Sequence, residues 1–222
     1  MSREMLPTLV DKIAPKWTAV IVIDVQNDFV SLGGAFQRTG EDVTTAQTIL
    51  PRIVGLIHVA REKKVPVIFI TSIYTTDDNR YLSDVFLHQM KRKRTGRYFE
   101  VPVCSPGSWG AQLAPGLEVL AQDTVVIKHR YSAFINTDLE LRLRSQGVRT
   151  LLITGVSTSV CVESTTRHAH FLDYYNVILS DCCADYKNNI HEEALRRLDL
   201  HFGQVAESKD IIASWQATVM GL

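Results

Sequence analysis

The feature that most constrains this fold is a series of short apolar runs separated by segments with helical periodicity. The runs cover residues 18–24, 65–71, 124–128, 150–155 and 176–180, and residues 204–206 add a short candidate edge strand. Almost unbroken apolar runs of this length are typical of parallel strands buried on both faces of a sheet. Apolar residues recur at helical spacing in residues 44–64, 139–147, 161–172, 191–201 and 210–219. Strands that alternate with helices predict an α/β fold built from right-handed crossovers.

The chain shows no internal repeat, low-complexity tract or linker that would divide it, so we predict one domain over residues 1–222. Residues 1–17 form a polar lead-in, in which Pro7 and Pro15 disfavour a continuous helix. Residues 72–116 are the least regular part. Because long connections in compact domains tend to be functional, we interpret this segment as a variable insertion or lid.

Charge and composition exclude several classes of partner. Lys and Arg total 24, and Asp and Glu also total 24, so no net field attracts nucleic acid. The N-terminal residues lack the apolar run of a signal peptide, and no stretch approaches the roughly 20 apolar residues of a membrane span. The four cysteines form no CxxC pair. We therefore expect a cytoplasmic protein with reduced thiols that binds neither nucleic acid nor membrane.

Three reactive side chains stand at the ends of predicted strands or just beyond them. Asp24 and Lys128 end two apolar runs, and Cys161 begins the helical pattern that follows a third. Strand ends of a parallel sheet share one edge, so these residues can meet. The backbone amides at a helix start favour the thiolate form of a cysteine and can also bind an oxyanion. A carboxylate such as Asp24 can accept the thiol proton, and an ammonium such as Lys128 lowers the pKa of the thiol. The pattern predicts a cysteine nucleophile.

Other interpretations of these residues remain open at this point. A cysteine that begins a helix is by itself more often structural than catalytic. Cys182 and Cys183 follow another strand, where buried packing is favoured and a thiol redox role is a further option. Gln26 and Asn27 either organise the turn after the first strand or contact a substrate.

Three motifs together resemble those of the isochorismatase-like cysteine hydrolases. They read AVIVIDVQNDF at residues 19–29, KHRYSAFINTDL at 128–139 and GVSTSVCV at 155–162, and the resemblance covers about residues 18–206. It implies a three-layer α/β/α, Rossmann-like fold with a six-stranded, mainly parallel sheet. It further implies a triad of Asp24 as general base, Lys128 as orienting cation and Cys161 as nucleophile. A cis peptide at Val156–Ser157 and an oxyanion hole formed by the amides of Ser157 and Cys161 are also implied.

Within this family, the cysteine favours amide chemistry, because members that hydrolyse the vinyl ether of isochorismate lack the thiol. The motifs most resemble the ureidoacrylate, biuret and triuret hydrolase branch. We therefore predict a cysteine-dependent amidohydrolase that cleaves a C–N bond of a small ureido or carboxamide compound through a thioester, releasing ammonia or an amine. The alternatives are a non-covalent hydrolase of the isochorismatase type and a catalytically silent binding protein of the same fold.

The resemblance also bears on the metal, the substrate residues and the assembly. Nicotinamidases carry a metal-binding Asp-x-His near the end of the second strand, but residues 71–77 read TSIYTTD, so we expect neither a metal nor another cofactor. The family implies a homodimer or homotetramer. Candidate substrate-binding residues are chosen by their position near strand ends: Gln26, Asn27, Phe29, Tyr74, Tyr131 and Asn136.

Overall fold

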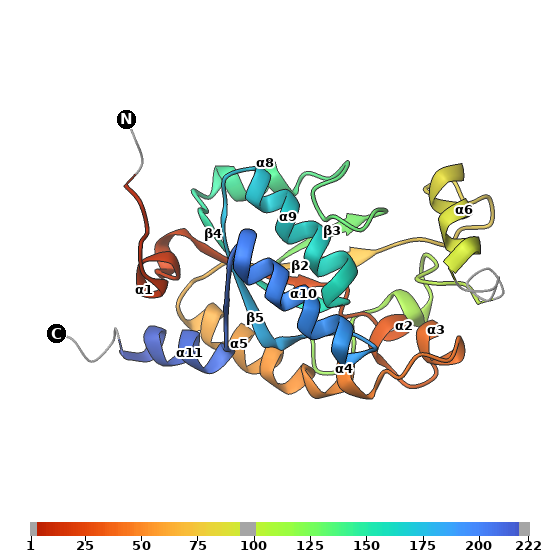
Figure 1. Ribbon diagram of the computed structural model, residues 1–222, viewed down its shortest axis with the longest axis horizontal. Helices are drawn as coiled ribbons and strands as arrows, with labels where there is room; N and C mark the ends of the chain where they lie inside the picture. Colours follow the sequence, from red (N-terminus) through yellow and green to blue (C-terminus); the bar gives the residue numbers. More distant parts are fainter. Residues whose placement is uncertain (1–3, 94–100, 218–222) are drawn as a thin grey trace.

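The computed structural model describes residues 4–93 and 101–217 and contains one six-stranded sheet (Figure 1). The strands are β1 (Thr18–Ile23), β2 (Val67–Ser72), β3 (Thr124–Lys128), β4 (Thr150–Val156), β5 (Tyr175–Ala184) and β6 (Gln204–Ala206). Their order is β3-β2-β1-β4-β5-β6, and each neighbouring pair is parallel. The predicted fold class and the predicted edge strand at residues 204–206 are confirmed.

Helices surround this sheet on both sides. The α-helices are α1 (Leu9–Lys12), α2 (Asn27–Val30), α3 (Ala35–Arg38), α4 (Thr44–Thr48), α5 (Leu50–Glu62), α6 (Asp84–Lys93), α8 (Leu139–Ser145), α9 (Glu163–Phe171), α10 (Asn188–His201) and α11 (Ser208–Ala217). Two 3₁₀ turns, η1 (Pro15–Trp17) and η2 (Trp109–Ala111), and one π turn, η3 (Thr158–Val162), complete the described elements.

Alternating side chains of the strands build two separate cores. In β1, Val20 and Val22 belong to the core shared with α5 and α11, whereas Ile21 and Ile23 belong to the core shared with α8, α9 and α10. Figure 1 shows α5 and α11 below the sheet and α8 and α9 above it. Because both faces are covered, the central strands are apolar at almost every position, as the sequence pattern predicts.

Three local predictions differ from the structure. The helix predicted at residues 44–64 is divided into α4 and α5, because Pro51 lacks an amide hydrogen and lies in the first turn of α5. The helix predicted at residues 139–147 ends two residues earlier, because α8 covers Leu139–Ser145, with Asp138 as its N-cap. The fifth strand extends to Ala184 rather than ending at residue 180.

The terminal segments and the long connection also have local structure. The lead-in carries α1, which begins with a capping box between Thr8 and Asp11. The segment predicted as an insertion, residues 72–116, contains α6 and η2, and its residues 94–100 lie outside the described part. The last two residues of the helix predicted at 210–219 lie outside it as well.

Among the described residues, no helix is both long and apolar enough to cross a membrane.

Candidate active site

The site lies at the carboxyl edge of the sheet, where several strands each supply one polar residue. Asp24 follows β1, Ser72 ends β2, Lys128 ends β3, and Cys161 lies in η3 after β4. The chain runs outward from β1 through β2 to β3 on one side and through β4 to β6 on the other. The boundary between β1 and β4 is therefore a topological switch point, where open α/β sheets bind their ligands.

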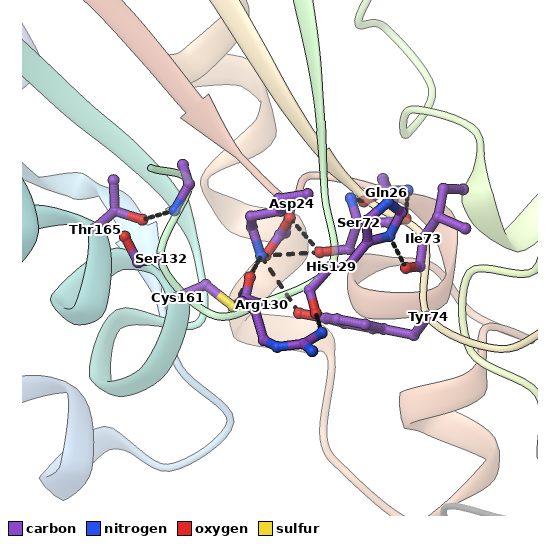
Figure 2. Close-up of polar contacts among 12 residues, drawn as sticks. Asp24, Gln26, Ser72, Ile73, Tyr74, His129, Arg130, Ser132, Cys161 and Thr165 are labelled. Atoms are coloured by element: carbon purple, nitrogen blue, oxygen red, sulfur yellow. Dashed lines mark hydrogen bonds and ion pairs between the residues drawn. The ribbon is translucent and has the colours of Figure 1, made fainter. Parts of the chain in front are cut away.

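The structure brings the three predicted catalytic residues together. Lys128 Nζ lies 2.8 Å from Asp24 Oδ2 and donates a hydrogen bond to Cys161 Sγ at 3.4 Å. Lys128 is fully buried, Asp24 is 1% exposed and Cys161 is 7% exposed. A lysine is almost never buried so completely without a partner, and here the Asp24 carboxylate supplies the opposite charge. Figure 2 shows Asp24 and Cys161 in this cluster, beside Ser72 and Tyr74.

Ser72 is a member of the cluster that the sequence analysis missed. Its hydroxyl donates to Asp24 Oδ1 at 2.8 Å and accepts a hydrogen bond from Lys128 Nζ at 2.9 Å. Lys128 also donates to the Arg130 carbonyl at 3.0 Å and to the Tyr74 hydroxyl at 3.4 Å. The signal in the sequence is a polar residue that ends an apolar run next to the strand of Asp24.

The protonation states in this cluster follow from burial and from the neighbouring charges. Burial raises the pKa of Cys161 to about 12, opposed by the charge of Lys128 and reinforced by the charge and hydrogen bond of Asp24. Burial alone would lower the pKa of Lys128, but Asp24 and Cys161 raise it above its ordinary value. The cysteine is thus a neutral thiol beside an ammonium, which differs from the thiolate expected at a helix start.

The nucleophile turn differs from a simple helix start. The Val156–Ser157 peptide is cis, as the resemblance implies. Cys161 lies inside the π turn η3, which closes with a hydrogen bond from the Val162 amide to the Ser157 carbonyl at 3.2 Å. Within the described part of the chain, the Ser157 amide has no hydrogen-bond acceptor. This amide is free to bind an anion.

Gly155 lets the two central strands approach each other just before this turn. Its φ is 113°, and a Cβ atom there would lie 2.0 Å from the Ile23 carbonyl oxygen on β1. Only glycine combines that backbone conformation with such a close approach.

The side chains of Gln26 and Asn27 hold backbone groups near Asp24. Gln26 Oε1 accepts from the Ser72 amide at 2.6 Å, and its Nε2 donates to the carbonyls of Ser72 at 3.0 Å and Ala111 at 2.8 Å. Asn27 Nδ2 donates to the Trp109 carbonyl at 2.9 Å. Of the two roles left open by the sequence, these contacts are those of turn organisation.

Three of the other candidate substrate residues lie in an aromatic group next to the triad. The ring of Tyr74 has centroid distances of 6.5 Å to Phe29 and 5.6 Å to Phe86, and Tyr131 lies 5.3 Å from Phe86. Asn136 is exposed, and no hydrogen bond joins it to the triad among the described residues. The structure therefore gathers Phe29, Tyr74 and Tyr131 and leaves Asn136 aside.

The other cysteines are buried and reduced. Cys104, Cys182 and Cys183 are free thiols, and burial raises the pKa of each; for Cys182 it reaches about 12. In residues 4–93 and 101–217, no three His, Cys, Asp or Glu side chains are grouped so that they could hold a metal ion.

A parallel α/β sheet with cysteine, lysine and aspartate at its switch point defines the class of an α/β cysteine hydrolase. The isochorismatase domain matches residues 18–210, and the chain belongs to this family. The ureidoacrylate amidohydrolase RutB of Acinetobacter baylyi is 31% identical over 214 residues, covering 92% of this chain and 86% of the relative. That of Serratia proteamaculans is 33% identical over 203 residues, with 87% and 81% covered.

Solved structures agree with this assignment. A cysteine hydrolase from Pseudomonas syringae pv. phaseolicola superposes with a TM-score of 0.79 at 26% identity, covering 98% of this chain and 99% of the other. The nicotinamidase/pyrazinamidase PncA from Bacillus subtilis gives a TM-score of 0.72 at 29% identity, with 86% and 100% covered. These matches confirm the predicted family, the fold and the enzyme class, an amidohydrolase that acts on carbon–nitrogen bonds.

Proposed function

We propose that the protein hydrolyses a C–N bond of a small ureido or carboxamide compound through a covalent thioester on Cys161. The observation that carries the proposal is the position of Lys128 Nζ, 2.8 Å from Asp24 Oδ2 and 3.4 Å from Cys161 Sγ. A nucleophile, a base and a cation that contacts both are the groups that acyl transfer to a thiol requires. The relatives are ureidoacrylate amidohydrolases, which supports a ureido substrate.

In the proposed reaction, Asp24 accepts the thiol proton while Sγ attacks the carbonyl carbon. The amides of Ser157 and Cys161 bind the oxyanion that forms. Asp24 then gives the proton to the leaving nitrogen, the C–N bond breaks, and ammonia or an amine leaves a thioester on Cys161. Water attacks the thioester with Asp24 as base, the acid product departs, and the sulfur recovers its proton. This sequence requires no metal and no cofactor.

The high pKa of Cys161 determines where its proton goes. With a pKa of about 12, the thiol does not ionise to solvent at neutral pH. The proton must therefore pass directly to Asp24, whose carboxylate contacts the same ammonium as the thiol and raises the pKa of Cys161. Among the described residues, Lys128 Nζ forms no hydrogen bond or ion pair with a histidine. Asp24 is therefore the base next to the nucleophile.

The proposed substrate contacts come from the aromatic group beside the triad. Phe29, Tyr74 and Tyr131 supply flat apolar surface for a planar ureido or amide group, while Gln26 and Asn27 shape the loop around Asp24. Asn136 stays a prediction from the sequence.

The decisive experiment measures ammonia release from a panel of ureidoacrylate, biuret, triuret, maleamate, nicotinamide and N-carbamoyl compounds. We expect activity on ureido compounds that is lost in Cys161→Ala and Cys161→Ser and is insensitive to chelators. Full activity in Cys161→Ala would refute the covalent route. Tolerance of Cys161→Gly would instead favour a non-covalent reaction, and inactivity on every compound would favour a silent binding protein.

We also propose a cytoplasmic homodimer or homotetramer in which residues 72–116 act as a lid. Contacts support the lid: the Asn27 amide donates to the Gln112 carbonyl at 2.9 Å, and the Ala114 amide donates to the Val25 carbonyl at 2.9 Å. These bonds attach the far end of the segment to the loop that carries Asp24. Light scattering during size-exclusion chromatography tests the assembly, and a monomer would contradict it.

A further inference from the structure

The nucleophile turn is held from its outer side by two residues that the proposed reaction does not use. Asp185 follows β5, and its Oδ2 accepts hydrogen bonds from the Ser159 amide at 2.9 Å and from the Ser159 hydroxyl at 2.7 Å. His191 lies in α10, which packs against η3, and its Nδ1 is 2.8 Å from the Thr158 hydroxyl oxygen. Two consecutive residues of η3 are thereby fixed to two separate elements.

Both oxygens of the Asp185 carboxylate accept hydrogen bonds from neutral donors. It is 7% exposed, and among the described residues it forms no ion pair. Its Oδ1 accepts from the Tyr186 amide at 2.9 Å, and the Tyr186 hydroxyl donates to the Phe29 carbonyl at 3.1 Å. A buried carboxylate is costly unless several hydrogen bonds satisfy it. Here those bonds connect the nucleophile turn to the α2 segment that follows Asp24.

The imidazole of His191 also holds the nucleophile turn, through its hydrogen bond with Thr158. Burial lowers its pKa, and only the charges of Asp185 and Glu192 oppose that effect, so the ring is neutral near pH 7. Thr158 is fully buried and offers its hydroxyl to this ring. The pair is thus a neutral hydrogen bond, which costs less to bury than a charged one.

The position of the turn matters because the thiol and an oxyanion donor both lie on it. The amides of Val160 and Val162 bond to the Ser157 carbonyl at 3.1 and 3.2 Å, which closes the turn around Cys161. A shift of the turn moves both the Cys161 sulfur and the Cys161 amide relative to Lys128. Misplacement of reacting groups by about 1 Å can reduce a rate about 100-fold.

We propose that Asp185 and His191 are positioning residues that hold η3 so that Cys161 stays in reacting geometry. The proposal rests on the role of Cys161 as the nucleophile. Asp185 acts through Ser159 and His191 acts through Thr158, and neither touches the substrate. Their loss lowers kcat more than it changes KM, because their bonds to η3 fix the thiol, whereas only Asp185 connects to the aromatic group, through Tyr186 and the Phe29 carbonyl.

The chain offers a matched control for Asp185. Asp181 lies in β5, the strand that Asp185 follows, and accepts the same pair of bonds from another serine, the Ser208 amide at 2.8 Å and the Ser208 hydroxyl at 2.6 Å. Those bonds hold the first residue of α11 instead of the nucleophile turn. Asp185→Ala and Asp181→Ala therefore remove the same pair of bonds to a serine, and only the first pair reaches Cys161. Asp185→Ala also removes the bond from the Tyr186 amide, and Asp181→Ala removes a 4.0 Å ion pair with Arg52.

The experiment compares steady-state kinetics and hydrogen exchange for the two variants and the wild-type enzyme. We expect Asp185→Ala to lower kcat by about 10- to 100-fold with KM within about threefold, the range for residues that orient reacting groups. Exchange should accelerate in residues 157–163. Asp181→Ala should keep kcat within about twofold, with faster exchange only near Ser208.

Variants at His191 keep the test decisive even when Asp185→Ala does not fold. His191→Asn places an amide oxygen near the position of Nδ1, so it should retain most of kcat, whereas His191→Ala should lose about tenfold. A kcat within threefold of wild type in both Asp185→Ala and His191→Ala would overturn the proposal, as would an equal loss in Asp181→Ala. If the wild-type enzyme releases no ammonia from the panel, the proposed function fails, and hydrogen exchange alone still decides whether Asp185 holds the turn.

Discussion

The charges around Cys161 predict that two substitutions of its partners change the reactivity of the thiol in opposite directions. Asp24 disfavours the thiolate and Lys128 favours it. Replacing Asp24 by Asn removes the negative charge and leaves the ammonium. Replacing Lys128 by Met does the reverse. Both variants should lose hydrolysis, but only Asp24→Asn should make the sulfur easier to alkylate.

The distances set the size of these effects. Asp24 Oδ2 and Cys161 Sγ both contact Lys128 Nζ, at 2.8 and 3.4 Å, so they lie at most about 6 Å apart. At an effective dielectric constant of about 20, a unit charge at no more than about 6 Å is worth at least about 3 kcal/mol and one at 3.4 Å about 5 kcal/mol. The thiolate fraction at a given pH should therefore rise at least roughly 100-fold in Asp24→Asn and fall roughly 4,000-fold in Lys128→Met.

The assay is the rate of Cys161 alkylation by iodoacetamide, followed by mass spectrometry of the peptide that contains it. The pKa of about 12 means that the thiolate fraction rises with pH across the whole accessible range. The wild-type rate should therefore increase about tenfold per pH unit between pH 7 and 10 without a plateau. At pH 8, Asp24→Asn should react about 100-fold faster than wild type and Lys128→Met more slowly.

Two controls keep the comparison clean. Cys161→Ala gives the background from the other three cysteines, which are all buried. Circular dichroism shows whether Lys128→Met is folded, because an unpaired buried carboxylate costs about 3–5 kcal/mol. A wild-type rate that levels off near neutral pH, or an Asp24→Asn variant that reacts no faster, would refute a neutral thiol controlled by these two charges.

Three further predictions concern the scaffold. Gln26→Leu removes three buried side-chain hydrogen bonds, and urea denaturation should show a loss of about 2–4 kcal/mol. Gly155→Ala places a Cβ atom against the Ile23 carbonyl, so it should give no soluble folded protein. The control Gly55→Ala in α5 meets no atom within 4 Å and should add about 0.5–1 kcal/mol to the free energy of unfolding. Trp215→Ala removes a side chain that is 1% exposed and donates to the Ile13 carbonyl at 2.7 Å, and thermal unfolding should report a loss of about 3–5 kcal/mol.

The strands were predictable because burial on both faces leaves a signal in the sequence itself. All six residues of β1 and all seven of β4 are buried, so each is a continuous run of apolar and small residues. Asp24 and Lys128 stand out because a charge ends such a run. The parallel arrangement then brings both residues to one edge, which requires no knowledge of side-chain packing.

The rest of the site depends on tertiary contacts that a linear pattern does not carry. Ser72 and Asp185 look like ordinary polar residues at strand ends, and only the packed structure gives them Asp24 and Ser159 as partners. The thiolate predicted for Cys161 differs from the structure for the same reason. A helix start favours a thiolate, but the burial that outweighs this effect arises only when the elements pack around the sulfur.

The five contacts of Lys128 suggest how a thiol of high pKa can react. An ammonium has three hydrogens, and its three shortest contacts go to oxygen: Asp24 at 2.8 Å, Ser72 at 2.9 Å and Arg130 at 3.0 Å. Cys161 Sγ, at 3.4 Å, is among the two longest. While the cysteine is a thiol, the negative charge that balances the ammonium lies on Asp24.

Transfer of the proton from Cys161 to Asp24 exchanges these roles without changing the total charge. Asp24 becomes neutral and attracts the ammonium less, while the sulfur becomes negative and attracts it more. Lys128 needs only to redistribute its hydrogen bonds between two atoms that it already contacts. The cost of forming the thiolate inside the site is therefore smaller than a pKa of about 12, which refers to release of the proton to solvent, would imply. Lys128 is therefore required because its ammonium contacts both residues, and it stabilises the Asp24 carboxylate before the proton transfer and the Cys161 thiolate after it.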